Sequence, residues 1–184
     1  MKHYTYYIIA LLTLFTACGN TDYEYSGYPC YFIFNNSASQ SPALASATNP
    51  NSPGIFCRVT MPNANYFNFN TNQGLSDKVA LTALDKQRTN KLGVYNGTGI
   101  IIGYGNLNNP AILYAYASQC PNCFKDTSMP RYQLTMKTNG TAECGSCHRK
   151  YDMNNDGLII DGDQGDKLIR YHASIAGGIV SVIN

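Results

Sequence analysis

Short apolar runs alternate with polar breaks through the second half of the chain. The runs GIIIGYG (residues 99–105), AILYAYAS (111–118) and RYQLTMK (131–137) are rich in aromatic and β-branched residues. Gly, Asn, Pro or Asp separates these runs, and KLIRYHASI (167–175) and GIVSVIN (178–184) continue the pattern. Strands of this length and spacing are typical of antiparallel sandwiches and small barrels, so the pattern predicts an all-β fold.

The first half of the chain is less regular. CYFIFN (residues 30–35) and GIFCRVT (54–60) predict strands, and the Ser-, Ala-, Asn- and Pro-rich segment 36–53 predicts a long loop. Residues 61–74 are dominated by Asn and aromatic side chains, which indicates a loop or an irregular sheet edge. Residues 75–91 fit either a helix or a short strand over 79–84 followed by a polar turn.

The N-terminus has the pattern of an export signal. Lys2 precedes an apolar run over residues 6–15 that is too short to span a bilayer and ends in small residues. The run ends in LFTAC (14–18), which resembles the lipobox of bacterial lipoproteins. This resemblance implies a signal peptide over residues 1–17 and a lipid on Cys18 that anchors the protein in a membrane. An ordinary cleavable signal with an incidental cysteine is the alternative.

Length and charge set the remaining bounds. Removing 17 residues from 184 leaves 167, a length that normally forms one domain, so we expect a polar tether over residues 18–27 and a single domain over 28–184. The 13 basic and 11 acidic side chains give a formal charge of +2 without a basic cluster, which predicts no nucleic-acid partner. The export signal places the protein in the cell envelope, either periplasmic or at the cell surface.

Two C-x-x-C pairs are the strongest chemical signal in the sequence. Cys120 and Cys123 form one pair, and Cys144 and Cys147 form the other. Each pair follows a predicted strand, so each lies on a loop at a strand end. Two such loops can direct four thiolates at one tetrahedral ion, as in zinc and some iron sites. Exported proteins usually hold cysteines as disulfides, so oxidised pairs are the alternative.

The sequences around these pairs carry a family resemblance. YAYASQCPNC (residues 114–123) and CGSCHRKYD (144–152), followed by a glycine turn, together resemble the ligand loops of the Rieske ferredoxin family. The resemblance covers residues 99–184 and implies a small antiparallel β-sandwich with two cysteine-bearing loops and a closing hairpin. In the implied register, Cys120 and Cys144 match the cysteines of the family and Cys147 matches a histidine. Asn122 or, as the better ligand, Cys123 takes the place of the other histidine.

The replacement of both histidines changes the expected cofactor. A Rieske cluster has two histidine ligands on one iron, whereas four thiolates suit zinc, a single iron or an all-cysteine [2Fe–2S] cluster. Zinc is the preferred ion, because closed four-cysteine sites are commonly structural zinc sites. We therefore expect a membrane-anchored metal-binding module without catalytic activity. An iron centre would instead indicate electron transfer to a redox partner, and oxidised cysteines would indicate a structural or interaction lipoprotein.

Two further cysteines lie inside predicted strands. Cys30 and Cys57 flank the segment 36–53. A disulfide between them would close that loop and contribute about 3 kcal/mol on a chain-entropy estimate. We therefore expect these two residues to form a disulfide.

A weaker signal follows the second cysteine pair. DMNNDGLIIDGD (residues 152–163) places Asp152, Asn154, Asp156 and Asp163 at the first, third, fifth and twelfth positions of an EF-hand-type calcium loop. NNDG is also an ordinary turn between two strands, and the Rieske-like register requires a hairpin here. The turn is the preferred interpretation and calcium binding the second.

The CPNC sequence also occurs in thiol–disulfide oxidoreductases. In such enzymes the first cysteine is activated at the N-terminus of a helix. The residues around Cys120 predict β-structure and no helix, which argues against this activity. His148 follows Cys147 directly, and we expect it to be an exposed loop residue.

Overall fold

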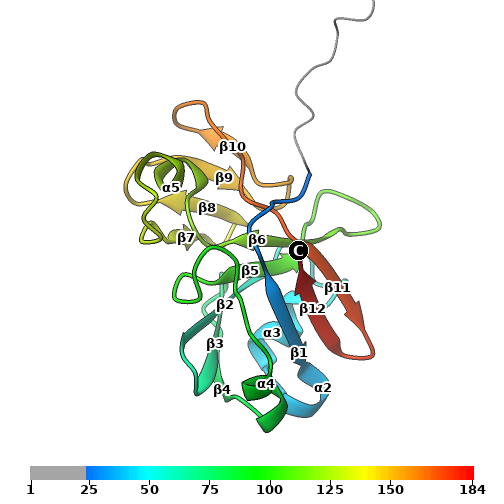
Figure 1. Cartoon of the computed structure of the whole chain (residues 1–184). Helices are drawn as coiled ribbons and strands as arrows, with labels where there is room; N and C mark the ends of the chain where they lie inside the picture. Colours follow the sequence, from blue (N-terminus) through cyan, green and yellow to red (C-terminus); the bar gives the residue numbers. More distant parts are fainter. Residues whose placement is uncertain (1–23) are drawn as a thin grey trace, which may run out of the picture.

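Three antiparallel sheets carry the chain, as Figure 1 shows. The computed structural model describes residues 24–184, so the predicted signal peptide and Cys18 lie outside the described residues. None of the three sheets closes into a barrel. The prediction of an all-β antiparallel fold is confirmed, in its open-sheet form.

The three-stranded sheet joins the two ends of the described chain. Its order is β1 (Tyr31–Asn35), β12 (Ile179–Ile183), β11 (His172–Ala176). Strands β11 and β12 form an antiparallel hairpin, and β1 pairs with β12 along its whole length. Burial alternates along β1 and β12, so one face of this sheet packs on the rest of the molecule.

The five-stranded sheet is the centre of the molecule. Its order is β4 (Ser76–Ala80), β3 (Tyr66–Thr71), β2 (Phe56–Asn63), β5 (Ile100–Tyr104), β6 (Leu113–Ala117). The prediction of a loop or irregular edge over residues 61–74 was wrong, because β3 lies inside the sheet between β2 and β4. Phe67 and Phe69 alternate with asparagines along β3 and are both buried, which is the two-residue period of a strand.

Residues 36–53 contain two short helices, α2 (Asn36–Ser39) and α3 (Pro42–Ala47), where the composition predicted a loop. Ser41 caps α3 by accepting a hydrogen bond from the N–H of Leu44, and Pro42 occupies the first helical turn. Leu44 is fully buried on one face of α3. A Ser-Pro pair before an apolar residue was therefore a helix-start signal.

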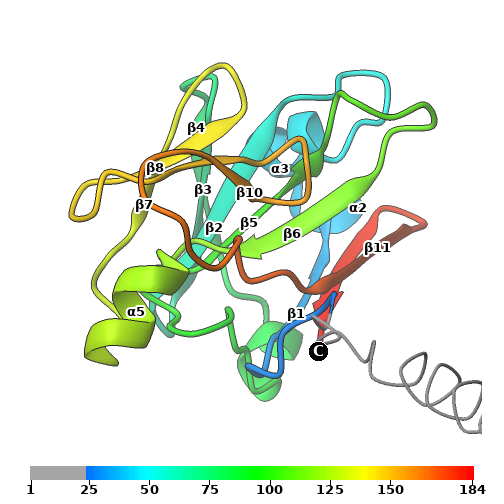
Figure 2. The same cartoon turned by 90° about the horizontal axis from the view of Figure 1, so that it is seen from above.

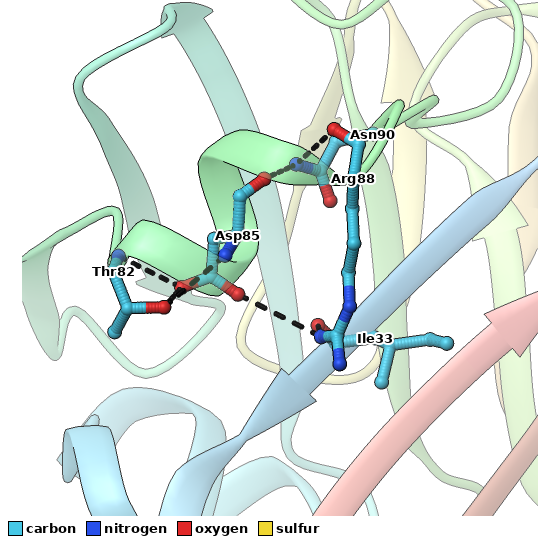
Figure 3. A network of polar contacts seen from close by, with 5 residues as sticks. All are labelled: Ile33, Thr82, Asp85, Arg88 and Asn90. Atoms are coloured by element: carbon cyan, nitrogen blue, oxygen red, sulfur yellow. Dashed lines mark hydrogen bonds and ion pairs between the residues drawn. The ribbon is translucent and has the colours of Figure 1, made fainter.

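Residues 75–91 contain one strand and one helix, where the composition predicted either a helix or a strand over 79–84 followed by a polar turn; the strand ends at Ala80, and a helix takes the place of the turn. Strand β4 is followed by helix α4 (Ala83–Gln87), which begins with a capping box between Thr82 and Asp85. The Asn90 side-chain amide donates to the Asp85 carbonyl at 2.8 Å, one of the contacts drawn in Figure 3. Arg88 donates to the carbonyl of Ile33 at 3.2 Å and thereby ties α4 to β1.

The four-stranded sheet and helix α5 (Pro121–Thr127) form the upper left of Figure 1. The sheet is a run of consecutive hairpins in the order β10 (Leu158–Asp161), β9 (Lys150–Asp152), β8 (Thr141–Cys144), β7 (Leu134–Met136). The expectation of no helix after Cys120 was wrong. Cys120 has the extended backbone of an N-cap residue, and Pro121 suits the first helical position.

Two hydrophobic cores lie on opposite faces of the five-stranded sheet. Ile100 and Ile102 face the first, which contains four phenylalanines and is called the phenylalanine core: Phe32, Phe34, Phe67 and Phe69. Ile101 faces the second, which contains three of the paired cysteines and is called the cysteine core. Figure 1 shows α5 and β7 to β10 above β5 and β6, and Figure 2 shows them from above, with β10 passing in front of the central strands.

The end of the predicted tether lies against the domain. The N–H of Ser26 donates to the Arg170 carbonyl at 2.9 Å, and Glu24 forms an ion pair with the Arg170 guanidinium at 2.9 Å. The ring of Tyr25 stacks on His172 with centroids 3.5 Å apart. Within residues 24–184, no helix is long and apolar enough to cross a membrane.

Candidate metal centre

The two C-x-x-C pairs meet at one point in the cysteine core. Cys120 is the N-cap of α5 and Cys123 lies in its first turn, so the turn brings both thiols to the same side. Cys144 is the last residue of β8, and Cys147 lies in the following turn, where the N–H of His148 donates to the Cys144 carbonyl at 3.0 Å. All four sulfurs lie within 4.8 Å of one another. The predicted convergence of the two loops is confirmed.

The sulfur positions suit a single ion. Cys120 Sγ lies 3.7 Å from Cys147 Sγ, and Cys123 Sγ lies 3.7 Å from Cys144 Sγ. A tetrahedron with metal–sulfur bonds of about 2.3 Å has edges of about 3.8 Å. A binuclear cluster would divide the thiolates between two iron atoms and so hold some sulfurs farther apart. The four residues therefore fit one tetrahedral ion better than a [2Fe–2S] cluster.

The four cysteines differ in exposure. Cys120, Cys123 and Cys144 are buried, whereas Cys147 is half-buried. Burial raises the pKa of Cys120 to about 11 and also raises the pKa of Cys123. Buried thiols of this kind stay protonated in the absence of a cation, and they lose their protons when they bind a metal ion.

Arg149 acts on the outermost sulfur. Burial favours the neutral thiol of Cys147, but hydrogen bonds from the backbone and the guanidinium of Arg149 outweigh that effect and lower its pKa to about 7. The charged guanidinium thus stabilises the Cys147 thiolate at the solvent side of the site.

A tyrosine and an asparagine support the innermost sulfur. The Tyr151 hydroxyl lies 3.3 Å from Cys120 Sγ, and the Asn122 side-chain amide donates to the same hydroxyl at 2.9 Å. Because Asn122 occupies the oxygen as an acceptor, the Tyr151 proton is free to point at Cys120. The Cys120 thiolate therefore gains a fixed hydrogen-bond donor inside the core.

Residues 163–166, called the strap, join the two cysteine loops. Asn122 of the first loop forms two reciprocal hydrogen bonds of 2.9 Å with the backbone N–H and carbonyl of Asp166. Arg149, just after the second loop, donates to the carbonyls of Asp163 at 2.9 Å and Gln164 at 3.1 Å. One backbone segment thus holds both cysteine loops at a fixed separation.

The strap requires a glycine at residue 165. A Cβ atom on Gly165 would lie 2.2 Å from the Asn122 side-chain oxygen, well inside van der Waals contact. Asn122 is itself buried, so it has little room to move away. The close approach of the strap to the first cysteine loop therefore depends on the missing side chain.

The side chains of the predicted calcium loop are used elsewhere. The Asp156 carboxylate forms ion pairs with Lys167 at 2.5 Å and Arg170 at 2.9 Å. The Asn154 side-chain oxygen accepts from the N–H of Asn106, and Asp152 accepts from the N–H of Asn154.

Among residues 24–184, the four cysteines are the only group of three or more His, Cys, Asp or Glu side chains close enough to share an ion, and Asp163 lies in the strap. The predicted calcium ligands therefore do not come together. Residues 153–157 instead form the turn of the β9–β10 hairpin, which was the preferred interpretation.

Cys30 and Cys57 are free, buried thiols, so the predicted disulfide is not formed. Their thiols have different surroundings. Cys30 interacts with the backbone of Gly93, whereas Cys57 interacts with the backbone of Asn70. Burial raises the pKa of Cys30 to about 12, as expected of an inert core thiol. Cys30 directly precedes β1 and Cys57 lies in β2, so their place in one core did not imply that the two sulfurs face each other.

The helix after Cys120 does not activate that cysteine. Helix α5 has 7 residues, and an oxidoreductase would require a lowered pKa at the first thiol. Burial has the opposite effect on Cys120. His148 is exposed, as predicted, and is not one of the clustered residues.

Sequence reasoning missed most of the supporting groups. Tyr151 belongs to the motif that carries the family resemblance, and Asn122 stands between the first two cysteines, so both lay within sequences already singled out. Nothing along the chain relates the strap to either loop. Comparisons with known protein families, with curated proteins and with solved structures found no match.

Proposed function

We propose that this protein is an exported, lipid-anchored, Rieske-like β-domain protein that binds one structural zinc ion through Cys120, Cys123, Cys144 and Cys147. The observation that carries the proposal is the sulfur cluster, with contacts of 3.7 Å between the two loops and all four sulfurs within 4.8 Å. The lipobox-like sequence before Cys18 supports the anchor and the cell-envelope location. The Rieske-like part rests on the two cysteine motifs and on the aromatic-Asp pair after the second.

The environment of the cluster favours a structural role. Zinc has no redox chemistry, and here it would cross-link helix α5 to the turn between β8 and β9. Four thiolates and one Zn²⁺ carry a net charge of about −2, which the Arg149 guanidinium beside Cys147 partly offsets. Tyr151 and Asn122 orient the Cys120 ligand from inside the core.

A single iron is the second candidate. Cys147 is half-buried at the solvent side of the cluster, which would give electrons a short route to a redox partner. Tyr151 and Arg149 form hydrogen bonds with the sulfurs, and such hydrogen bonds tune the reduction potential of an iron–thiolate centre. In that case the protein would transfer electrons.

Elemental analysis with visible spectroscopy on protein purified without chelators tests the proposal. We expect one zinc per chain and no visible absorption. Cys123→Ser should abolish stoichiometric zinc binding, whereas Cys30→Ala, which removes a buried thiol outside the cluster, should retain it. One iron per chain with absorption that bleaches on reduction would select the electron-transfer candidate. Protein without metal, lighter by two hydrogens for each bridge, would reject both metal proposals.

A further inference from the structure

One of the four clustered cysteines is open to reagents in solution. Cys147 is half-buried, and the other three cysteines are buried. Gly145, Ser146 and His148, which share its turn, are all exposed. A small oxidant that diffuses to the cluster therefore meets the sulfur of Cys147 first.

The sulfur in contact with Cys147 belongs to the other motif. Cys120 Sγ lies 3.7 Å away, and a disulfide needs about 2.05 Å, so a movement of about 1.6 Å joins them. The Tyr151 hydroxyl lies 3.3 Å from Cys120 Sγ and fixes the position of that sulfur beside Cys147. The short distance between the two sulfurs places Cys120 to attack an oxidised Cys147.

We propose that Cys147 is an oxidation site and that it forms a disulfide with Cys120 across the two C-x-x-C pairs, which releases the metal under oxidising conditions. The inference rests on the proposed metal site and adds a redox response to it. Because the contact between Cys123 and Cys144 also measures 3.7 Å, a second oxidation would join these two in the same crossed manner.

The chemistry uses hydrogen peroxide as the oxidant. The Cys147 thiolate attacks one peroxide oxygen, the O–O bond breaks, and a sulfenic acid and a hydroxide form. The Cys120 thiolate then attacks the Cys147 sulfur, the S–O bond breaks, and a second hydroxide leaves as the disulfide forms. Two electrons pass from the two sulfurs to the peroxide, and both hydroxides take up protons to give water.

Disulfide formation removes two of the four ligands. The remaining sulfurs, Cys123 and Cys144, cannot complete a tetrahedral site, so the affinity for zinc falls. The new bond would join helix α5 to the β8–β9 turn, which is the connection that the ion makes in the reduced protein. The two cysteine loops would therefore stay joined in the oxidised protein after the metal is lost.

Peptide mapping of the full-length protein treated with stoichiometric hydrogen peroxide tests the inference. Trypsin places Cys120 and Cys123 in the peptide 92–125, and Cys144 and Cys147 in 138–149. We expect the two peptides to appear linked without reductant, together with release of zinc to a chromophoric chelator. Two separate peptides, each lighter by two hydrogens, would overturn the inference, as would a sulfonic acid on Cys147 without any bridge.

Paired variants identify the sulfurs involved. Cys123→Ser/Cys144→Ser retains only Cys120 and Cys147 in the cluster, and we expect one rapid bridge. Cys120→Ser/Cys144→Ser retains Cys123 with Cys147, and we expect its bridge to form at least about tenfold more slowly. Equal rates would contradict the proposed pairing.

Failure of the proposed zinc site can be distinguished from failure of the proposed disulfide. Wild-type protein purified without metal would reject the zinc site. The bridge pattern of the reduced, metal-free protein would still decide whether the crossed disulfide forms.

Discussion

The phenylalanine core and the cysteine core are stabilised in different ways. Phe32 and Phe34 of β1 contact Phe67 of β3 with centroids 5.5 and 5.9 Å apart, and β2 and β3 beneath them have 8 and 6 residues. The cysteine core rests on β7 and β9, which have 3 residues each, and its centre contains sulfurs and hydrogen-bonded Tyr151. Apolar burial suffices for the first core. Under the proposed function, the second would in addition depend on a cross-link that the bound ion supplies.

Loss of the ion should therefore destabilise the cysteine core and leave the phenylalanine core folded. This is the largest effect we expect. In Cys144→Ser the site loses one ligand, and structural zinc contributes on the order of 10 kcal/mol to the folding of such lobes. Hydrogen–deuterium exchange should show β8 and β9 exchanging at least about a hundredfold faster, with β1 and β12 still protected. The control Cys30→Ala should leave exchange in β8 and β9 unchanged. Unaltered protection of β8 and β9 in Cys144→Ser would contradict a structural role.

Features formed by residues close together in the chain could be predicted from the sequence. The strands of the second half and the convergence of the four cysteines follow from local patterns, because each C-x-x-C turn is formed by residues next to each other in the chain. Helix α3 and strand β3 were missed, because Ser41 and Phe67 act through capping and alternation within segments whose composition resembles a loop.

Tertiary placement could not be predicted in the same way. The strap reaches Asn122 from 41 to 44 residues farther along the chain, and no periodicity marks it. Cys30 and Cys57 share a core, but their thiols contact different backbone segments, which depends on side-chain direction and not on sequence position. Sequence patterns thus identified the ligands and not the groups that hold them.

A change confined to the phenylalanine core should lower stability without changing metal binding. Phe67→Ala removes a fully buried ring in contact with three other phenylalanines, and we expect a loss of about 3–5 kcal/mol in the free energy of unfolding. Urea unfolding measures the loss, and elemental analysis should still give one zinc per chain. Loss of zinc from folded Phe67→Ala would show that the cores are not independent.

Replacement of Asn122 should affect only the cysteine core, by weakening zinc binding. Asn122→Ala deletes the hydrogen bond to Tyr151 and both bonds to the strap, so we expect zinc affinity to fall about 10- to 100-fold. Competition with a chromophoric chelator measures the affinity. Asn139→Ala, an exposed asparagine in the β7–β8 turn, is the matched control and should bind zinc like the wild type. Equal zinc affinities in the two variants would contradict a role of Asn122 in supporting the site.

The smallest effect should come from Arg149→Lys. Lysine keeps the positive charge beside Cys147 but cannot donate to two strap carbonyls in the planar geometry of a guanidinium. We expect zinc affinity to fall less than about tenfold in Arg149→Lys and further in Arg149→Ala. Arg131→Lys, on an exposed arginine, is the control. An Arg149→Ala protein with wild-type affinity would show that the strap and the charge are both dispensable.

X-ray absorption spectroscopy of the purified, metal-loaded protein tests the central claim most directly, because it reports the number and kind of atoms bound to the metal. Four cysteine ligands around one ion predict a single shell of four sulfurs at about 2.3 Å from zinc, with no second metal nearby. A metal–metal distance typical of a binuclear cluster, or a shell in which nitrogen or oxygen replaces sulfur, would contradict the account.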